Sequence, residues 1–233
     1  KENVGILTKR GVTVLPVGDG ELASGVSGPG RMLEVEELVS RIGALSASAE
    51  LAGRKVLIGS GPTEEPIDPV RVVTNRSSGK MGAALARAAL GMGASVTVVS
   101  GPAAEPLPAG VRRIDVRTAA QMQKAMASEF ARCDICVMAA AVSDFRPQRA
   151  SRSKIARSGA EGLTVKLVPN PDILAALGRA KKRSQFLVGF ALESEKGVAS
   201  AATKLERKKC DMMVLNYVGS SLGLDTARVT IVY

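Results

Sequence analysis

Histidine and tryptophan are absent from this chain of 233 residues, and aromatic residues make up only 3% of it. Without an imidazole, Ser-His and Cys-His nucleophiles and His-ligated metal sites are excluded. Acid, base and electrophilic roles must therefore fall to Lys, Arg, Asp, Glu, Asn or backbone groups. The four Phe and two Tyr residues are dispersed, so a base-stacking platform for RNA or single-stranded DNA is not expected.

Cysteine is scarce as well, and its three residues cannot form a disulfide framework. Cys133 and Cys136 have the spacing of a redox pair or of half a zinc site, but no second pair of ligands exists. We therefore predict plain thiols in a reducing cytosol, with Cys136 in a buried strand. No apolar run approaches the roughly 18 residues of a membrane span, and the start lacks both Met and a signal peptide. These features predict a cytoplasmic protein without a membrane partner, and a fragment or processed form.

Positive charge is plentiful, because 32 Lys and Arg residues against 22 Asp and Glu give a net charge of +10. Such a balance suits nucleic acid, an acidic membrane surface or small anionic ligands. The cations are mostly dispersed and the aromatics few. We therefore expect small anions such as nucleotides rather than nucleic acid as partners.

From residue 54 onward, short Val, Ile and Leu runs alternate with amphipathic Ala-rich segments. This pattern predicts an α/β fold with an open, mostly parallel, Rossmann-like sheet, helices on both faces, and ligands at the carboxyl ends of the strands. Strands are expected at 55–59, 95–99, 112–116, 134–140, 163–168, 186–191, 211–216 and 228–232, and helices at 79–91, 118–131, 171–181 and 196–209.

The first 45 residues differ from the rest in composition. They predict a short strand at 12–16, a Gly-rich loop at 18–30 and a helix from about Glu34. Residues 46–54 are interpreted as a linker, so the main domain is expected to span 55–233.

A polar loop of about 18 residues follows the first strand of that domain, and ordered loops of this length are mostly functional. It leads into Ser77, Ser78, Gly79 and Lys80 at the start of a helix, where hydroxyls, free amides and a cation suit an anion. An ordinary Ser cap would have the same composition. The third Gly of a dinucleotide-binding loop and the Ser or Thr of a Walker A motif are both missing.

The run from Gly61 to Gly82 resembles phosphopantothenoylcysteine synthetase, also called phosphopantothenate–cysteine ligase, of coenzyme A biosynthesis. Further matching motifs follow in family order across residues 55–233: Gly93–Pro102, Ala139–Arg146, Lys154-Ile155, Asn170–Ile173, Val188–Glu193 and the pair Lys204 and Lys208. Bacterial members are usually fusions with a flavin-dependent decarboxylase. Residues 20–32 resemble the substrate loop of that half, with Ser24 where the family often has Cys. Residues 1–45 are therefore interpreted as a decarboxylase remnant without the catalytic His or the flavin-binding body.

The resemblance implies CTP-dependent ligation of 4′-phosphopantothenate to L-cysteine through an acyl-cytidylate, releasing pyrophosphate and then CMP. It further implies Mg²⁺ to neutralise the triphosphate, a homodimer, and FMN only in the missing decarboxylase half of a bifunctional parent. Relatives also continue beyond the residue that matches Tyr233. Two alternatives stay open: a catalytically silent nucleotide-binding module, favoured by changes in one motif, and a dinucleotide-dependent oxidoreductase.

Two residues are implied to be catalytic. Lys154 matches the first lysine of the family's K-x-K-K motif, which stabilises the reacting phosphate, although here Ala156 and Arg157 replace the last two lysines. Asn75 matches an Asn that contacts phosphopantothenate and the acyl intermediate; otherwise it is a turn residue with a left-handed backbone. Arg71 either binds the substrate or clamps the loop to Asp68.

The remaining expected ligands match other family motifs, and no residue is assigned to a metal. The substrate would also contact Ala140, Ala141 and Asp144. The nucleotide would contact Ser77, Ser78, Gly79, Lys80, Met138, Ala139, Ala140, Asp144, Lys154, Asn170, Pro171, Asp172, Ile173, Phe190, Lys204 and Lys208. Simpler interpretations are a core Phe190, a surface pair of Asp144 with Arg146, a helix cap at Asn170 or Asp172, and a solvated face for Lys204 and Lys208.

Overall fold

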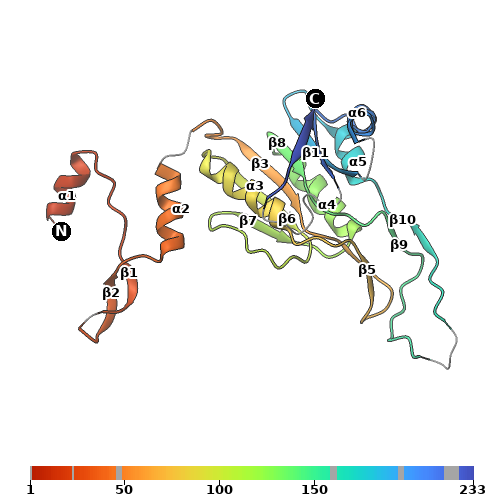
Figure 1. Cartoon of the computed structure of the whole chain (residues 1–233), viewed down its shortest axis with the longest axis horizontal. Coiled ribbons are helices and arrows are strands. Elements are labelled where there is room, and N and C mark those ends of the chain that lie inside the picture. The colour runs from red at the N-terminus through yellow and green to blue at the C-terminus, as the bar shows by residue number, and fades with distance from the viewer. Residues whose placement is uncertain (1, 23, 46–48, 158–161, 194–196, 218–225) are drawn as a thin grey trace. The chain divides into compact units, whose positions relative to one another are not determined.

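The computed structural model describes residues 2–22, 24–45, 49–157, 162–193, 197–217 and 226–233 (Figure 1). The chain divides into two compact units, Lys1–Ser48 and Ala49–Tyr233. This boundary lies inside the segment predicted as a linker. The assignment of the first residues to a decarboxylase remnant stays a prediction.

The first unit contains two helices and a hairpin in its described residues: α1 (Glu2–Lys9), β1 (Gly18–Glu21), β2 (Ser27–Arg31) and α2 (Val35–Leu45). The helix predicted from Glu34 is confirmed as α2. The strand predicted at 12–16 is wrong, because Val12 and Val14 are exposed and have no partner strand. The loop predicted at 18–30 instead holds β1 and β2, which pair antiparallel around a turn where Gly25 has a φ of 78°.

The second unit is built on a seven-stranded sheet with the order β13-β12-β11-β8-β3-β6-β7. Its strands are β3 (Lys55–Ser60), β6 (Ser95–Ser100), β7 (Arg112–Asp115), β8 (Ile135–Met138), β11 (Phe186–Glu193), β12 (Met212–Tyr217) and β13 (Val229–Val232). All neighbours pair in parallel except β12 and β13, which are antiparallel. The predicted α/β fold is confirmed.

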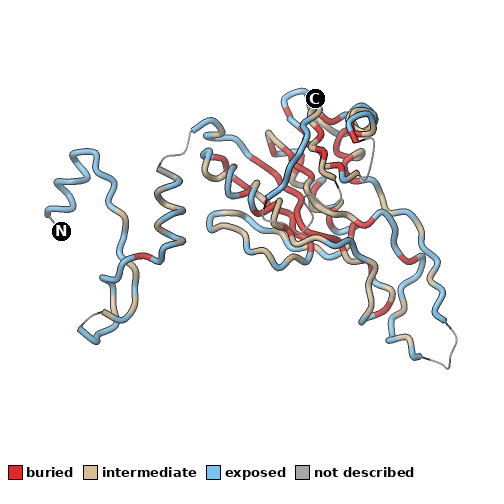
Figure 2. The backbone as a smooth tube through the Cα atoms, in the orientation of Figure 1, coloured by how far each residue is buried: buried red, intermediate tan, exposed pale blue. Residues whose placement is uncertain are grey.

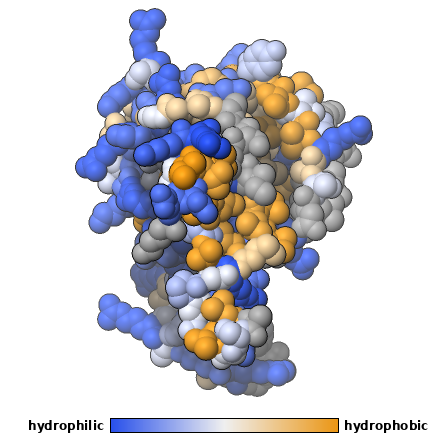
Figure 3. Space-filling view, turned by 90° about the vertical axis from the view of Figure 1, so that its left-hand side faces the viewer, coloured by the Kyte–Doolittle hydropathy of each residue, from blue (hydrophilic) through white to orange (hydrophobic). Residues whose placement is uncertain are grey.

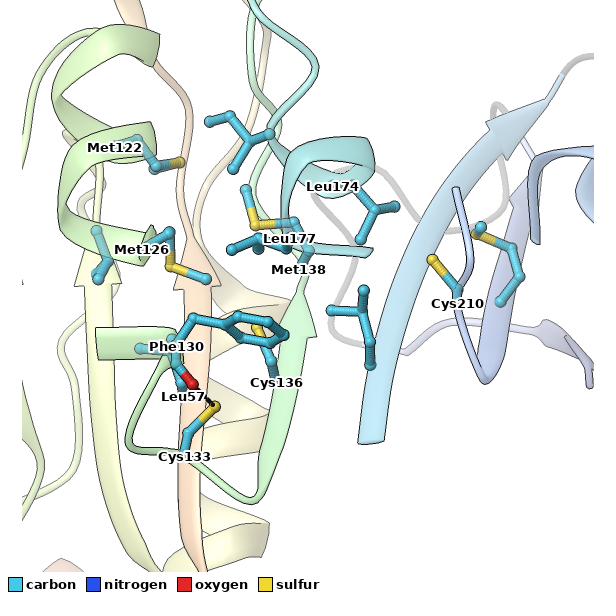
Figure 4. Packing of buried hydrophobic residues seen from close by; sticks show 14 of the residues in the cluster. Leu57, Met122, Met126, Phe130, Cys133, Cys136, Met138, Leu174, Leu177 and Cys210 are labelled. Carbon is cyan, nitrogen blue, oxygen red and sulfur yellow. Dashed lines mark hydrogen bonds between the residues drawn. The ribbon is translucent and has the colours of Figure 1, made fainter. Parts of the chain in front are cut away.

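Helices cover both faces of the sheet: α3 (Lys80–Gly91), α4 (Ala119–Phe130), α5 (Ile173–Ala180) and α6 (Gly197–Arg207). Side chains alternate along β3, so that Val56 and Ile58 pack in a cluster with Ala86 of α3. Leu57 points to the opposite face and packs in a cluster with residues of α4. Figure 4 shows Phe130 of α4 next to Leu57 in this second cluster, with Met126 and Met122 farther along the helix. Burial is accordingly concentrated in the sheet and the inner sides of its helices (Figure 2).

Two short ribbons lie outside the main sheet. Within the segment predicted as a polar loop, β4 (Glu64–Pro66) pairs antiparallel with β5 (Val72–Thr74). The strand predicted at 163–168 in the main sheet is wrong, because only β10 (Leu167–Pro169) forms there. It pairs antiparallel with β9 (Phe145–Pro147). Leu163 and Leu167 are 53% and 42% exposed, so their apolar character does not reflect burial in the sheet.

Candidate functional site

Two adjoining hollows lie where the parallel strands β8, β11 and β12 end. The smaller has a volume of about 240 Å³ and the larger about 850 Å³, and both are lined by Ala140, Ala141 and the segment 190–192. The carboxyl ends of parallel strands are the usual ligand-binding edge of such a sheet. The expected ligands that line one or both hollows are Ser77, Ser78, Gly79, Lys80, Met138, Ala139, Ala140, Ala141, Asp144, Asn170, Pro171, Asp172, Ile173, Phe190, Lys204 and Lys208.

The amino end of α3 forms one wall of the smaller hollow. Gly79 precedes the helix with a φ of 82°, and its position carries no side-chain cap. Ser78 Oγ is 3.4 Å from the backbone nitrogen of Lys80, which is a long hydrogen bond. The amides and partial positive charge of this helix end therefore face a hollow, which is an arrangement suited to an anion.

Asn216 lines the same hollow and was missed by the sequence-based prediction. Its Oδ1 atom is buried and has no hydrogen-bond partner among the described residues. A buried polar atom without a partner is costly unless a ligand or water satisfies it. The available signal was a polar residue closing the apolar run Met212–Leu215 at the carboxyl end of a strand.

Two lysines line the larger hollow, each paired with a carboxylate. Lys204 Nζ lies 2.5 Å from Glu193 Oε1, and Lys208 Nζ lies 3.2 Å from Asp172 Oδ2. Hydrogen bonds from Lys204 and Ser200 hold the pKa of the Glu193 carboxyl below its usual value. Side-chain exposures of 34% for Lys204 and 19% for Lys208 place both cations at a partly buried wall rather than on a fully solvated face.

Asparagine side chains fix the loop after β8. Asn75 Nδ2 donates to the carbonyl of Val142 at 2.9 Å, and Asn170 Nδ2 donates to the carbonyl of Ser143 at 2.9 Å. Asn75 does not have the left-handed backbone considered from the sequence, since Lys209 is the one non-glycine residue with positive φ in the described ranges.

The contacts also decide two simpler interpretations considered from the sequence, a helix cap at Asn170 or Asp172 and a surface pair of Asp144 with Arg146. Asp172 caps α5 by accepting a hydrogen bond from Ala175 N at 3.0 Å. Arg146 donates to the carbonyl of Pro169 and to Asn170 Oδ1. The pairing of Asp144 with Arg146 therefore has no support, and Asp144 lines the larger hollow as an exposed carboxylate.

Three predicted site residues do not line either hollow: Arg71, Asn75 and Lys154. Arg71 has the contacts of a clamp, because its Nη1 lies 3.2 Å from Asp68 Oδ2 and its Nη2 donates to the carbonyl of Ile155 at 3.2 Å. Lys154 is exposed on the neighbouring loop.

Side chains alone do not form a metal centre in the described ranges, where no three Asp, Glu or Cys residues are grouped to hold an ion. The larger hollow offers the carboxylates of Asp144 and Asp172, and Asp172 is already paired. The three cysteines are free thiols and Cys136 is buried in β8, as predicted, and Cys133 and Cys210 are buried as well. No helix in the described part of the chain is both long and apolar enough to cross a membrane.

Comparison with known proteins identifies several relatives. The family model "DNA/pantothenate metabolism flavoprotein C-terminal domain" matches residues 51–233. A cysteine/cysteine sulfinic acid decarboxylase from an unknown prokaryotic organism is 46% identical over 100% of this chain and 67% of its own length. The coenzyme A biosynthesis bifunctional protein CoaBC of Vibrio cholerae is 45% identical over 94% of this chain and 55% of its own length. The chain therefore spans about half the length of that relative.

A solved structure is similar to the chain as well. The crystal structure of the C-terminal domain of CoaBC has a TM-score of 0.67 and 38% sequence identity to the chain. The match covers 79% of this chain and 83% of that one.

Proposed function

Because the chain belongs to the DNA/pantothenate metabolism flavoprotein C-terminal domain family, we propose that its second unit is a phosphopantothenate–cysteine ligase of coenzyme A biosynthesis. The pair of hollows at one sheet edge carries the proposal. They are lined by a helix amino end, by an amide oxygen without a partner among the described residues, and by two lysines. Such a set of amides and cations suits a nucleoside triphosphate and a phosphorylated acid. The name of the Vibrio relative supports the same biosynthetic role.

The proposed reaction has two steps. The carboxylate of 4′-phosphopantothenate attacks the α-phosphorus of CTP, and the bond to pyrophosphate breaks. The amine of cysteine then attacks the acyl carbon of the acyl-cytidylate, and CMP leaves with the bonding electron pair while the amine loses a proton. Neither step requires histidine. Both steps develop negative charge on oxygen, which fixed cations and amides stabilise.

Roles for this chain's residues follow from that chemistry. Lys154 would stabilise the reacting phosphate, and Asn75 would hydrogen-bond the acyl oxygen. Lys204 and Lys208 would exchange their carboxylate partners for phosphate oxygens. Mg²⁺ would be held chiefly by the triphosphate, with Asp144 as the available carboxylate, and would supply neutralising charge.

Decarboxylation is not proposed for this chain, although one relative is named a decarboxylase. The chain has no histidine, and Ser24 stands where the family often has Cys. FMN is accordingly proposed only for a decarboxylase half. We further propose a cytoplasmic homodimer whose ligands are small molecules, with neither nucleic acid nor membrane as a partner.

Pyrophosphate release tests the ligase. The protein is incubated with CTP, Mg²⁺, 4′-phosphopantothenate and cysteine, and we expect pyrophosphate and the amide product in equal amounts. Binding of CTP without pyrophosphate above background would contradict the ligase and support a silent module, the alternative favoured by Ala156 and Arg157. Full replacement of CTP by ATP would contradict the assigned base.

Lys154→Gln tests whether the cation of Lys154 itself is needed for catalysis. We expect pyrophosphate release to fall about 10²- to 10³-fold, the usual effect of losing one charge-stabilising donor. Arg152→Gln, which removes the same charge from the same loop, is the control and should keep wild-type turnover. Asn75→Asp should instead impair the later step. Wild-type turnover by Lys154→Gln would refute the role given to that residue.

A further inference from the structure

Asp68 is a buried carboxylate in the turn between β4 and β5. Its side chain is 0% exposed. Oδ1 accepts hydrogen bonds from the backbone nitrogens of Val70 at 2.8 Å and Arg71 at 2.7 Å, which close the turn. This half of the carboxylate has a local role.

The other oxygen of Asp68 reaches a segment distant in the sequence. Oδ2 accepts from the backbone nitrogen of Ile155 at 3.1 Å and from Arg71 Nη1 at 3.2 Å. Arg71 Nη2 in turn donates to the carbonyl of Ile155 at 3.2 Å. A third link joins Ser151 N to the carbonyl of Ile67 at 2.8 Å. Both backbone polar groups of Ile155 are thus held by one ion pair.

The held residue directly follows Lys154. Its N–H belongs to the peptide plane shared with Lys154, and planar peptides transmit the constraint to the Cα atom of Lys154. The same hairpin continues from β5 into Asn75, whose amide reaches the loop after β8. The hairpin therefore connects the two residues proposed to be catalytic.

The contacts of Asp68 keep its carboxylate negatively charged. Burial alone would raise the pKa of its carboxyl, but hydrogen bonds from the Val70, Arg71 and Ile155 backbones and the charge of Arg71 outweigh that effect and lower the pKa. The carboxylate consequently stays ionised near neutral pH and keeps accepting from Ile155.

We infer that Asp68 is a positioning residue for the proposed ligase: it holds the backbone of the Lys154 loop (residues 148–157) at Ile155, so that loss of the tether displaces the segment that carries Lys154. Its effect on catalysis rests on the proposed function, whereas the tether itself does not. Asp68 touches no reacting atom in this role and acts through the loop.

Asp68→Asn tests the inference. The amide oxygen can serve the turn in place of Oδ1, but the NH2 group in place of Oδ2 is a donor and can accept from neither Ile155 N nor Arg71. We expect kcat for pyrophosphate release to fall about 10²-fold, as for a misplaced catalytic group, with KM for CTP changed less than about 3-fold. Hydrogen exchange of the Ile155 amide, measured by mass spectrometry on peptide 151–157, should quicken at least about 10-fold.

Glu64→Gln is the matched control, because it removes the same charge from the same hairpin while its partner is Arg117. It should leave both readouts at wild-type values. If Asp68→Asn does not fold, Ile155→Pro removes the tethered N–H without altering the hairpin and should show the same loss of kcat.

The outcomes separate the two proposals. If the wild-type protein releases no pyrophosphate, the ligase proposal is wrong. Exchange of the Ile155 amide in Asp68→Asn then still tests whether Asp68 holds the loop. Faster exchange with unchanged kcat defeats the positioning role while the ligase stands. Unchanged exchange in Asp68→Asn, or full activity in Ile155→Pro, overturns the inference outright.

Discussion

Individual side chains at the larger hollow hold two lysines in ion pairs. The pair Lys208–Asp172 joins the end of α6 to the amino end of α5, and Lys204 shares Glu193 with Ser200. Ion pairs that are partly exposed contribute little stability, so the proposed exchange of these carboxylates for phosphate oxygens should cost little. The pairs thus keep two flexible lysines near the hollow without occupying them permanently.

The three thiols are expected to differ in reactivity. A hydrogen bond from the Cys136 thiol lowers the pKa of Cys133, and donating that bond, together with burial, raises the pKa of Cys136. Burial raises the pKa of Cys210 to about 11. Because the thiolate is the reactive form, iodoacetamide at pH 8 should alkylate Cys133 first in the native protein. Mass spectrometry should find Cys136 and Cys210 labelled only after denaturation.

Cys133→Ser is the control for this experiment and should leave the native protein almost unlabelled. Lowering the pH from 8 to 6.5 should slow the reaction of Cys133, since a smaller fraction is ionised. Labelling of Cys210 in the native protein as fast as Cys133 would contradict the assignment.

At the scale of elements, α3 and β3 approach closely at Gly82. A Cβ atom there would lie 2.0 Å from Ser60 Oγ and 2.4 Å from Ser60 Cβ. Gly82→Ala must therefore push the helix off the strand, and we expect a loss of about 1–3 kcal/mol in the free energy of unfolding. Urea titration of both proteins measures the difference.

Gly91→Ala at the other end of α3 provides the comparison, because a Cβ there meets nothing within 4 Å. Higher helix propensity should make it neutral or more stable by up to about 1 kcal/mol. Equal stability of the Gly82 and Gly91 variants would show that the contact with Ser60 is relieved without cost.

Elements with a strong apolar pattern were predictable, and elements held by distant partners were not. The runs at 55–59 and 95–99 predicted strands seen as Lys55–Ser60 and Ser95–Ser100, because burial on both faces requires continuous apolar residues. The ribbon β4–β5 and the strand β9 escaped prediction, and β10 was predicted with wrong bounds and in the wrong sheet, since backbone pairing such as Leu167 with Pro147 leaves no local signature of its partner.

The candidate site follows the same division. The family resemblance, not residue type alone, assigned Ala139, Ala140 and Phe190 to the site, and all three line the smaller hollow. The outlying position of the Lys154 loop depends on contacts such as Asp68 with Ile155, 87 residues apart. No local pattern encodes a contact between such distant residues.

At the scale of the whole molecule, the two units differ in how much they bury. Leu33 is the one buried apolar side chain among those described in the first unit, where Val12, Val35 and Val39 are exposed. On the face shown in Figure 3, hydrophobic residues are exposed among hydrophilic ones. The second unit holds the extensive clusters on both faces of its sheet. Stability should therefore reside in the second unit.

Deleting the first unit tests that distribution. Residues 49–54 belong with the sheet, because Leu51 N donates to the carbonyl of Met92 at 2.9 Å and Ser95 N donates to the carbonyl of Arg54 at 2.9 Å. A fragment starting at Ala49 should unfold cooperatively within about 2 °C of the full chain, since its core is intact. A fragment starting at Val56 loses both contacts and the packing of Leu51, and should unfold several degrees lower. Calorimetry of the three proteins decides: a large drop for the Ala49 fragment would place essential contacts in the first unit.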